Sequence, residues 1–265
     1  MSDLFDLTGE MGLITGAGGQ LGYEHAFALL EKNASVVLCD VSLEGLKQNQ
    51  SRLISFFPNG SISHKILDVT NEENIKLVQN EFPAITILIN NAAINPKISK
   101  LASNAFESYD LEKWNSEILV GLTGAFLMSK YFGSKMAENG KGSIINIGSD
   151  LSVISPDQRI YQNIGSKQMT FKPVAYSVVK HGIVGLTKYL STYWAESGVR
   201  VNTLSPGGID FDLPTEFKTK VSNLIPMNRL ARPYEYRGAI QFLASEASSY
   251  MTGQNLVIDG GRTVW

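Results

Sequence analysis

The sequence predicts an α/β fold built on a doubly wound parallel sheet of about seven strands, with helices on both faces. Three observations predict it. Short apolar runs alternate with helical patterns, most runs are apolar on both faces, and no linker, charge block or repeat divides the 265 residues. We therefore expect residues 1–265 to form a single domain of the Rossmann type.

Each expected strand is a short run rich in apolar residues, and these runs lie at 11–15, 35–40, 62–67, 86–90, 143–148, 199–204 and 255–259. Helical patterns lie between them at 21–32, 43–56, 71–82, 111–139, 175–197 and 233–248. The third helix follows Thr70-Asn-Glu-Glu, which resembles a capping sequence. Strands that alternate with helices indicate βαβ units.

Two segments depart from this alternation. Residues 151–172 are polar and irregular, and residues 207–228 are interrupted by Pro214 and Pro226. Both follow expected strand ends, where open α/β sheets bind their ligands. We expect them to be substrate loops, although surface excursions without a role are the alternative.

The composition excludes several classes of protein. Lys and Arg number 23 and Asp and Glu 25, so the net charge of −2 offers no basic excess for nucleic acid or anionic lipid. A single cysteine, Cys39, excludes a disulfide framework, and three unpaired histidines give no metal-ligand pattern, so no metal is expected. With no signal peptide or long apolar run, we expect a cytoplasmic protein that does not bind membranes.

A glycine-rich turn joins the first expected strand to the first expected helix. In MGLITGAGGQLG, Gly16, Gly19 and Gly22 allow a tight turn and close approach of the backbone to a pyrophosphate, which the helix N-terminus would face. The next strand ends in Asp40, which is 40 − 22 = 18 positions after Gly22 and is suited to bind the adenosine ribose hydroxyls. The alternative is a glycine-rich turn with a solvated aspartate.

Asp40 also predicts the cofactor. A 2′-phosphate would lie against its carboxylate, and two like charges at ~4 Å cost ~4 kcal/mol at an effective dielectric constant of ~20. Val41 and Ser42 follow it, and the glycine loop carries no cation. The sequence therefore predicts NAD.

Further motifs appear in order along the chain: Asp68-Val69, Asn90-Asn91-Ala92-Ala93, Ser149, Tyr176-Ser-Val-Val-Lys180, Pro206-Gly207 and GQNLVIDGG. Together with TGAGGQLG they resemble the short-chain dehydrogenase/reductases, in their compact single-domain branch, over nearly the whole length. The resemblance implies a set of cofactor-binding residues: Gly16, Gly19, Gln20, Leu21, Gly22, Asp40, Asp68, Val69, Asn91, Ala92, Ala93, Tyr176, Lys180, Pro206, Gly207 and Ile209.

Three residues form the expected catalytic group. Tyr176 and Lys180 are four positions apart, on one face of a helix. A tyrosine has a pKa of ~10, and a nearby ammonium stabilises tyrosinate, so we expect Lys180 to lower the pKa of Tyr176. Tyr176 would exchange a proton with the substrate oxygen, Ser149 would hydrogen-bond that oxygen, and Lys180 would also hold the nicotinamide ribose.

The chain departs from the family pattern at four points. Gln20 replaces the middle glycine of the loop, Ala93 replaces the last glycine of N-N-A-G, and Gly121 stands where the family has a catalytic Asn that helps hold a water in a proton relay to the lysine. Ser149 and Tyr176 are 176 − 149 = 27 positions apart, about twice the usual gap in the family.

The extra residues of this gap predict the substrate. The loop carries Arg159 and Gln162, and Lys167 and Lys172 are weaker candidates, so we expect a polar and sugar-like substrate. The alternative is that Arg159 anchors the loop by pairing with Asp150 or Asp157. DQRIY and DGGRTVW also resemble a subgroup of oxidoreductases of bacterial flagellin modification and surface-sugar pathways.

The sequence thus predicts an NAD-dependent oxidoreductase that interconverts a secondary alcohol and a ketone. An epimerase or dehydratase with tightly bound NAD and a non-catalytic nucleotide-binding protein are the alternatives. The helical stretches 118–136 and 176–195 carry more apolar residues than one sheet face needs, and paired helices are typical of the family, so we expect a homodimer or homotetramer through them.

Overall fold

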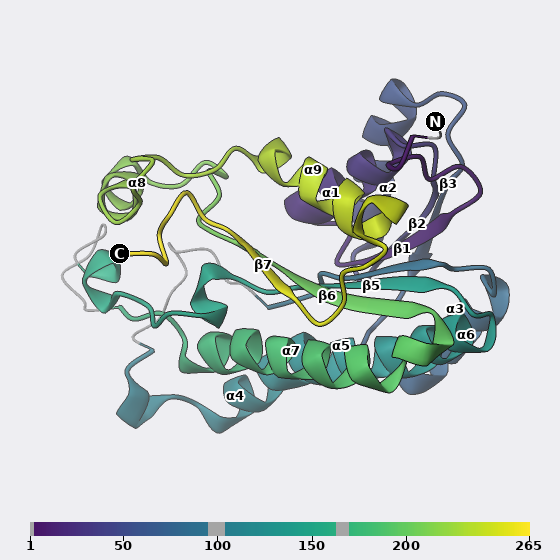
Figure 1. The fold of residues 1–265 in the computed structure, drawn as a ribbon. Helices are drawn as coiled ribbons and strands as arrows, with labels where there is room; N and C mark the ends of the chain where they lie inside the picture. The colour runs from purple at the N-terminus through teal and green to yellow at the C-terminus, as the bar shows by residue number, and fades with distance from the viewer. Residues whose placement is uncertain (1–2, 95–103, 163–169) are drawn as a thin grey trace.

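The computed structural model describes residues 3–94, 104–162 and 170–265. Seven parallel strands form one sheet in the order β3-β2-β1-β4-β5-β6-β7 (Figure 1). The strands are β1 (Met11–Thr15), β2 (Ser35–Asp40), β3 (Ile62–Ile66), β4 (Ile87–Asn90), β5 (Gly142–Ile147), β6 (Val199–Pro206) and β7 (Asn255–Ile258). The seven predicted strands and the doubly wound sheet are confirmed, with ends that differ by one or two residues.

Helices cover both faces of the sheet, as Figure 1 shows. One face carries α1 (Gln20–Leu30), α2 (Leu43–Phe56) and α9 (Arg237–Ala244). The other carries α3 (Glu72–Glu81), the run α4 (Leu111–Ile118), α5 (Gly124–Met128) and α6 (Ser134–Glu138), and α7 (Val174–Tyr193). Two separate apolar cores result, one around Leu29 and Ile240, the other around Met128 and Ile144.

Two details differ from the expected helices. The predicted helix 111–139 contains two π-helical stretches, Leu119–Thr123 and Ser129–Gly133, between its α-helical parts. The irregular segment 207–228 contains a further helix, α8 (Thr215–Ser222). The helix starts directly after Pro214, whose ring suits a helix start, and buries Phe217 and Val221, spaced four apart.

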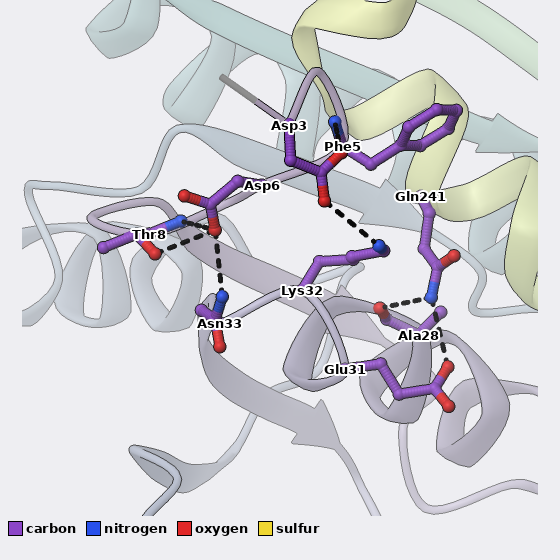
Figure 2. A network of polar contacts seen from close by, with 9 residues as sticks. All are labelled: Asp3, Phe5, Asp6, Thr8, Ala28, Glu31, Lys32, Asn33 and Gln241. Carbon is purple, nitrogen blue, oxygen red and sulfur yellow. Dashed lines mark hydrogen bonds and ion pairs between the residues drawn. The ribbon is translucent and has the colours of Figure 1, made fainter. Parts of the chain in front are cut away.

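Polar contacts join the N-terminal segment to the residues after α1, and join α9 to α1 (Figure 2). The Asn33 side-chain amide donates to Asp6 Oδ1 at 2.9 Å, and this hydrogen bond is the main cause that lowers the pKa of Asp6. The Gln241 amide of α9 donates to Ala28 O and to Glu31 Oε2, both at 3.1 Å. The two hydrogen bonds of Gln241 hold α9 beside α1 on the face of the sheet that also carries α2.

No helix within the described residues is long and apolar enough to cross a membrane.

Candidate active site

The sheet turns its strand order at β1 and β4, because β2 and β3 lie on one side of β1 and the later strands lie beyond β4. The segments that leave the carboxyl ends of these two strands therefore part in opposite directions, and open α/β sheets bind ligands at such a point. The glycine loop follows β1, and the Asn91-Ala92-Ala93 segment follows β4.

The glycine loop needs its glycines for steric reasons. Gly16 has φ +65°, a left-handed conformation that favours glycine, and a Cβ there would meet Asn91 Nδ2 at 2.9 Å. A Cβ at Gly22 would meet Gly16 O at 2.6 Å. Gly19 and Gln20 are exposed at the tip, so the part of the loop that faces a ligand is open.

Hydrogen bonds fix this loop to its neighbours. Asn91 Nδ2 donates to Thr15 O at 2.9 Å, and Thr15 Oγ1 accepts from the backbone N–H of Asn91 and of Ala92 at 3.0 and 3.1 Å. From α2, Asn49 Nδ2 donates to Ala17 O at 2.8 Å and to Gly19 O at 3.0 Å. Hydrogen bonds from the segment after β4 and from α2 thus hold the glycine loop in place before any ligand binds.

The residues present fit a dinucleotide. Helix α1 begins after Gly19 with no side-chain cap, so its first N–H groups are available to an anion. Asp40 Oδ2 accepts from Gly18 N and Oδ1 from Ser42 N, both at 2.9 Å, which fixes the carboxylate beside the loop. A carboxylate held there matches the ribose hydroxyls of a dinucleotide.

The other predicted cofactor residues lie around the same edge. Asp68 follows β3 in a turn in which its Oδ1 accepts from Thr70 N at 2.9 Å, and Val69 beside it is buried against Gly124. Pro206 ends β6, and a Cβ at Gly207 would meet Asp259 Cα at 2.7 Å. Ile209 bridges to Ala231 and Ala93 is exposed after β4. These residues thus follow the carboxyl ends of β3, β4 and β6, at one edge of the sheet.

Ser149, Tyr176 and Lys180 come together at the end of β5. Ser149 is buried and extended just after the strand, its hydroxyl donates to Asp150 Oδ1 at 2.8 Å, and it lies close enough to Tyr176 to lower the pKa of the phenol. Lys180 lies one turn along α7, is buried, and its Nζ donates to Ile147 O at 2.7 Å. The 27-residue separation in sequence therefore does not separate these groups in space.

The expected lowering of the Tyr176 pKa is not found in this structure. Burial raises the pKa of Tyr176 to about 12, the hydrogen bond with Ser149 opposes this, and the charge of Asp150 adds to it. Burial also lowers the pKa of Lys180 to about 8. The expectation weighed the charge of the lysine and left out desolvation, which disfavours both charged forms in this cofactor-free structure.

The structure adds Lys172 to this group. Its Nζ lies 3.6 Å from the Tyr176 ring centroid, closer than Lys180 Nζ at 5.7 Å. Burial lowers the pKa of Lys172 to about 8, while the charges of Asp150 and Glu117 raise it. Asp150 in turn accepts from the Ser149 hydroxyl at 2.8 Å. Lys172 stands four residues before Tyr176, and this spacing was the available signal.

Gly121 is explained by its neighbour. A Cβ at Gly121 would lie 2.6 Å from Val179 Cγ1, so the Val179 side chain occupies the space in which a side chain at position 121 would begin. Both residues line a cavity of about 10 Å³ together with Ala93, Ile94, Glu117, Tyr176 and Lys180. Glu117 is only 4% exposed and was not selected from the sequence.

The two loops pack on each other, as far as they are described. The ring of Tyr161 packs against that of Phe217 in a tilted arrangement with centroids 5.5 Å apart, and the Gln162 backbone oxygen accepts from Lys220 Nζ at 2.7 Å. Lys167 lies outside the described residues. Arg159 forms a bidentate ion pair with Asp157, in which Nε donates to Oδ1 at 2.9 Å and Nη2 donates to Oδ2 at 2.6 Å. Its side chain is 83% exposed, and this pairing agrees with the alternative in which Arg159 anchors the loop.

Comparison with known proteins identifies the family. A family model described as "Enoyl-(Acyl carrier protein) reductase" matches residues 16–263. The chain belongs to the short-chain dehydrogenase/reductase family. It is 34% identical to a D-threitol dehydrogenase of Mycolicibacterium smegmatis, over 98% of this chain and 95% of the relative. It is 32% identical to an NAD-dependent glycerol dehydrogenase of Listeria innocua, over 98% and 96%.

A solved structure agrees with the fold. The gluconate 5-dehydrogenase of Burkholderia cenocepacia, in complex with NADP and tartrate, superposes with a TM-score of 0.85 at 28% identity, covering 99% of this chain and 98% of that one. This short-chain dehydrogenase/reductase is therefore an oxidoreductase that acts on CH–OH groups and uses a nicotinamide cofactor. The narrower flagellin-modification resemblance stays a prediction.

Proposed function

We propose that this enzyme interconverts a secondary alcohol and a ketone on a small polyhydroxy substrate with NAD as its cofactor. The observation that carries the proposal is the convergence of Ser149, Tyr176, the buried Lys180 and the half-buried Lys172 beside a preorganised dinucleotide cradle.

The proposed chemistry follows from the residues. When bound, the nicotinamide supplies the hydride acceptor and a positive charge near the site. Ser149 orients the substrate hydroxyl by a hydrogen bond, and Tyr176 takes the hydroxyl proton at its phenolic oxygen. Lys180 Nζ and Lys172 Nζ lie 5.7 and 3.6 Å from the centroid of the phenol ring, and their positive charges would oppose the desolvation that raises the pKa of Tyr176.

The charge of the site supports a polar substrate. Lys172, Asp150 and Glu117 influence one another electrostatically around Tyr176, so the groups beside the reacting position are ionisable rather than apolar. An apolar substrate would leave them desolvated without partners, whereas hydroxyl groups can pair with them. The names of relatives, a threitol and a glycerol dehydrogenase, agree with a small polyol.

Asp40 supports NAD over NADP. Its carboxylate is fixed by two backbone N–H groups, so it cannot turn away from a 2′-phosphate without losing both hydrogen bonds. Some similar solved structures contain NADP, so the preference of this chain for NAD over NADP has to be measured on the chain itself. We also propose that the enzyme works in the cytoplasm, where its single buried cysteine stays reduced.

The test is turnover with a panel of three- to six-carbon polyols and their ketoses, followed by nicotinamide absorbance. We expect net NAD reduction by at least one polyol and its near loss in Tyr176→Phe, with cofactor binding retained. Bound NAD without net turnover, or a Tyr176→Phe variant with most of its activity, would contradict the proposal. The first outcome would favour an epimerase, a dehydratase or a binding protein.

A further inference from the structure

The cavity beside Tyr176 and Lys180 contains a buried acid that the proposed chemistry does not use. Glu117 lies near the end of α4 and is 4% exposed. It lines the cavity with Gly121, Tyr176, Val179 and Lys180. Buried carboxylates are rare unless they are paired or have a role, so this one requires an explanation.

Hydrogen bonding leaves part of the carboxylate free. The Tyr109 hydroxyl donates to Glu117 Oε1 at 3.0 Å. Burial and the charge of Glu117 raise the pKa of Tyr109, so the phenol remains a donor. Within the described residues no hydrogen bond reaches Oε2, and no cation lies within ion-pair distance of Glu117. Among the residues that the structure describes, one carboxylate oxygen thus has a donor and the other has none.

The cavity has the right size for one water molecule. Its volume is about 10 Å³, near the minimum of about 10–15 Å³ that a water molecule needs. Gly121 contributes no side chain to it, and the walls offer the Glu117 carboxylate, the Tyr176 phenol and the Lys180 ammonium. A water there would have two to four polar partners, which is what ordered buried water requires.

We propose that Glu117 accepts the proton that Tyr176 takes from the substrate, through one water in this cavity. The inference rests on the proposed function. Nicotinamide, when bound, would supply the acceptor for the hydride of the substrate carbon, and the substrate hydroxyl would lose its proton to the Tyr176 phenolate. The cavity water passes a proton to Glu117 as it takes the one from Tyr176, which restores the phenolate. The neutral Glu117 carboxyl then loses its proton to solvent, and each turnover releases one proton.

The charged groups around Glu117 fit this role. Tyr109 holds the carboxylate from the segment before α4, and Tyr176 and Lys180 face the cavity from α7. Lys172, before α7, is close enough for the charge of Glu117 to raise its pKa. The positive charges of Lys172 and Lys180 would thus stabilise the Glu117 carboxylate when it forms again after losing its proton to solvent.

The experiment compares Glu117→Gln and Glu117→Ala with Glu112→Gln, a control that changes an exposed acid on the same helix. We expect kcat for alcohol oxidation to fall about 10- to 100-fold in both Glu117 variants, with KM for the alcohol and NAD affinity changed less than threefold. The solvent deuterium isotope effect should rise and the isotope effect of the C-deuterated alcohol should fall, because proton transfer becomes the slow step. Acetate or formate should restore part of kcat in Glu117→Ala.

Several results would overturn the relay. If Glu117→Gln turns over like Glu112→Gln, or if kcat falls without any change in either isotope effect and without rescue, Glu117 acts by packing alone. Urea unfolding of each variant separates loss of fold from loss of proton transfer, and the near-isosteric glutamine keeps the test open if alanine unfolds. Absence of polyol oxidation by the unmodified enzyme would instead defeat the proposed function, and the relay with it.

Discussion

Replacing Gly121 by alanine tests whether Val179 has taken the space of a side chain at that position. The new Cβ would lie 2.6 Å from Val179 Cγ1, whereas carbon atoms in favourable contact are about 3.5–4.0 Å apart. Val179 sits within α7 and is buried, and valine in a helix keeps one strongly preferred rotamer, so it cannot turn away. Overpacking of this kind costs about 1–3 kcal/mol.

The change in unfolding free energy of Gly121→Ala also includes the higher helix propensity of alanine. Replacing a helical glycine by alanine otherwise stabilises by up to about 1 kcal/mol. We therefore expect Gly121→Ala to lower the free energy of unfolding by about 1–2 kcal/mol. Gly185→Ala in α7 is the matched control, because a Cβ there has no atom within 4 Å, and it should be neutral or stabilising.

A double-mutant cycle decides the cause. Val179→Ala alone removes two buried methyl groups and should cost about 1.5 kcal/mol or more. In Gly121→Ala/Val179→Ala the steric conflict is absent, so the double variant should be more stable than the sum of the single effects by about 1–3 kcal/mol. Urea unfolding with unchanged m-values measures this coupling. Additive effects, or a Gly121→Ala protein as stable as Gly185→Ala, would refute the steric explanation.

Four further predictions follow. Asp40→Ala should weaken NAD binding and narrow the preference for NAD over NADP, measured by fluorescence titration; equal affinities in the unmodified protein would contradict the cofactor argument. Lys180 has a folded pKa of about 8 against an unfolded value of about 10.4, so it binds fewer protons when folded, and it should make the cofactor-free protein more stable as the pH rises from about 8 to 10. Lys180→Met should flatten that rise. Lys172→Met should lower kcat/KM for the alcohol about tenfold or more. Arg159→Ala removes the partner of Asp157 and should mainly lower the stability of the loop, with little change in kcat/KM. If kcat/KM falls in Arg159→Ala and not in Lys172→Met, Arg159 binds the substrate as the sequence suggested. Sedimentation at micromolar concentration should find a homodimer or homotetramer, because the helices α4–α6 and α7 expose Phe126, Tyr189 and Tyr193, and a monomer would refute that interface.

The assembly prediction illustrates what sequence and structure each contribute. The excess of apolar residues at 118–136 and 176–195 is visible in the sequence. The structure separates the residues that are buried, such as Met128 and Ile183, from those that stay exposed, such as Tyr189 and Tyr193, which stack on each other with centroids 5.9 Å apart. Only the second group is available for a partner subunit.

The sequence by itself predicted the succession of strands and helices along the chain, the glycine loop with Asp40, and the candidate catalytic residues Ser149, Tyr176 and Lys180. These features depend on local pattern: apolar periodicity, glycine at a tight turn, and two residues four apart on one helix face. The topology of a parallel sheet then brings the strand ends together whatever the length of the segments between them.

Only the tertiary structure decided what surrounds these residues. Lys172 against Tyr176, Glu117 in the cavity, Val179 in the space beside Gly121, and Arg159 turned to Asp157 depend on how segments pack. The raised pKa of Tyr176 has the same origin, since desolvation depends on every atom that excludes water and not on the identity of one neighbour. Such effects have no local sequence pattern, because they arise from contacts between residues that the chain places far apart.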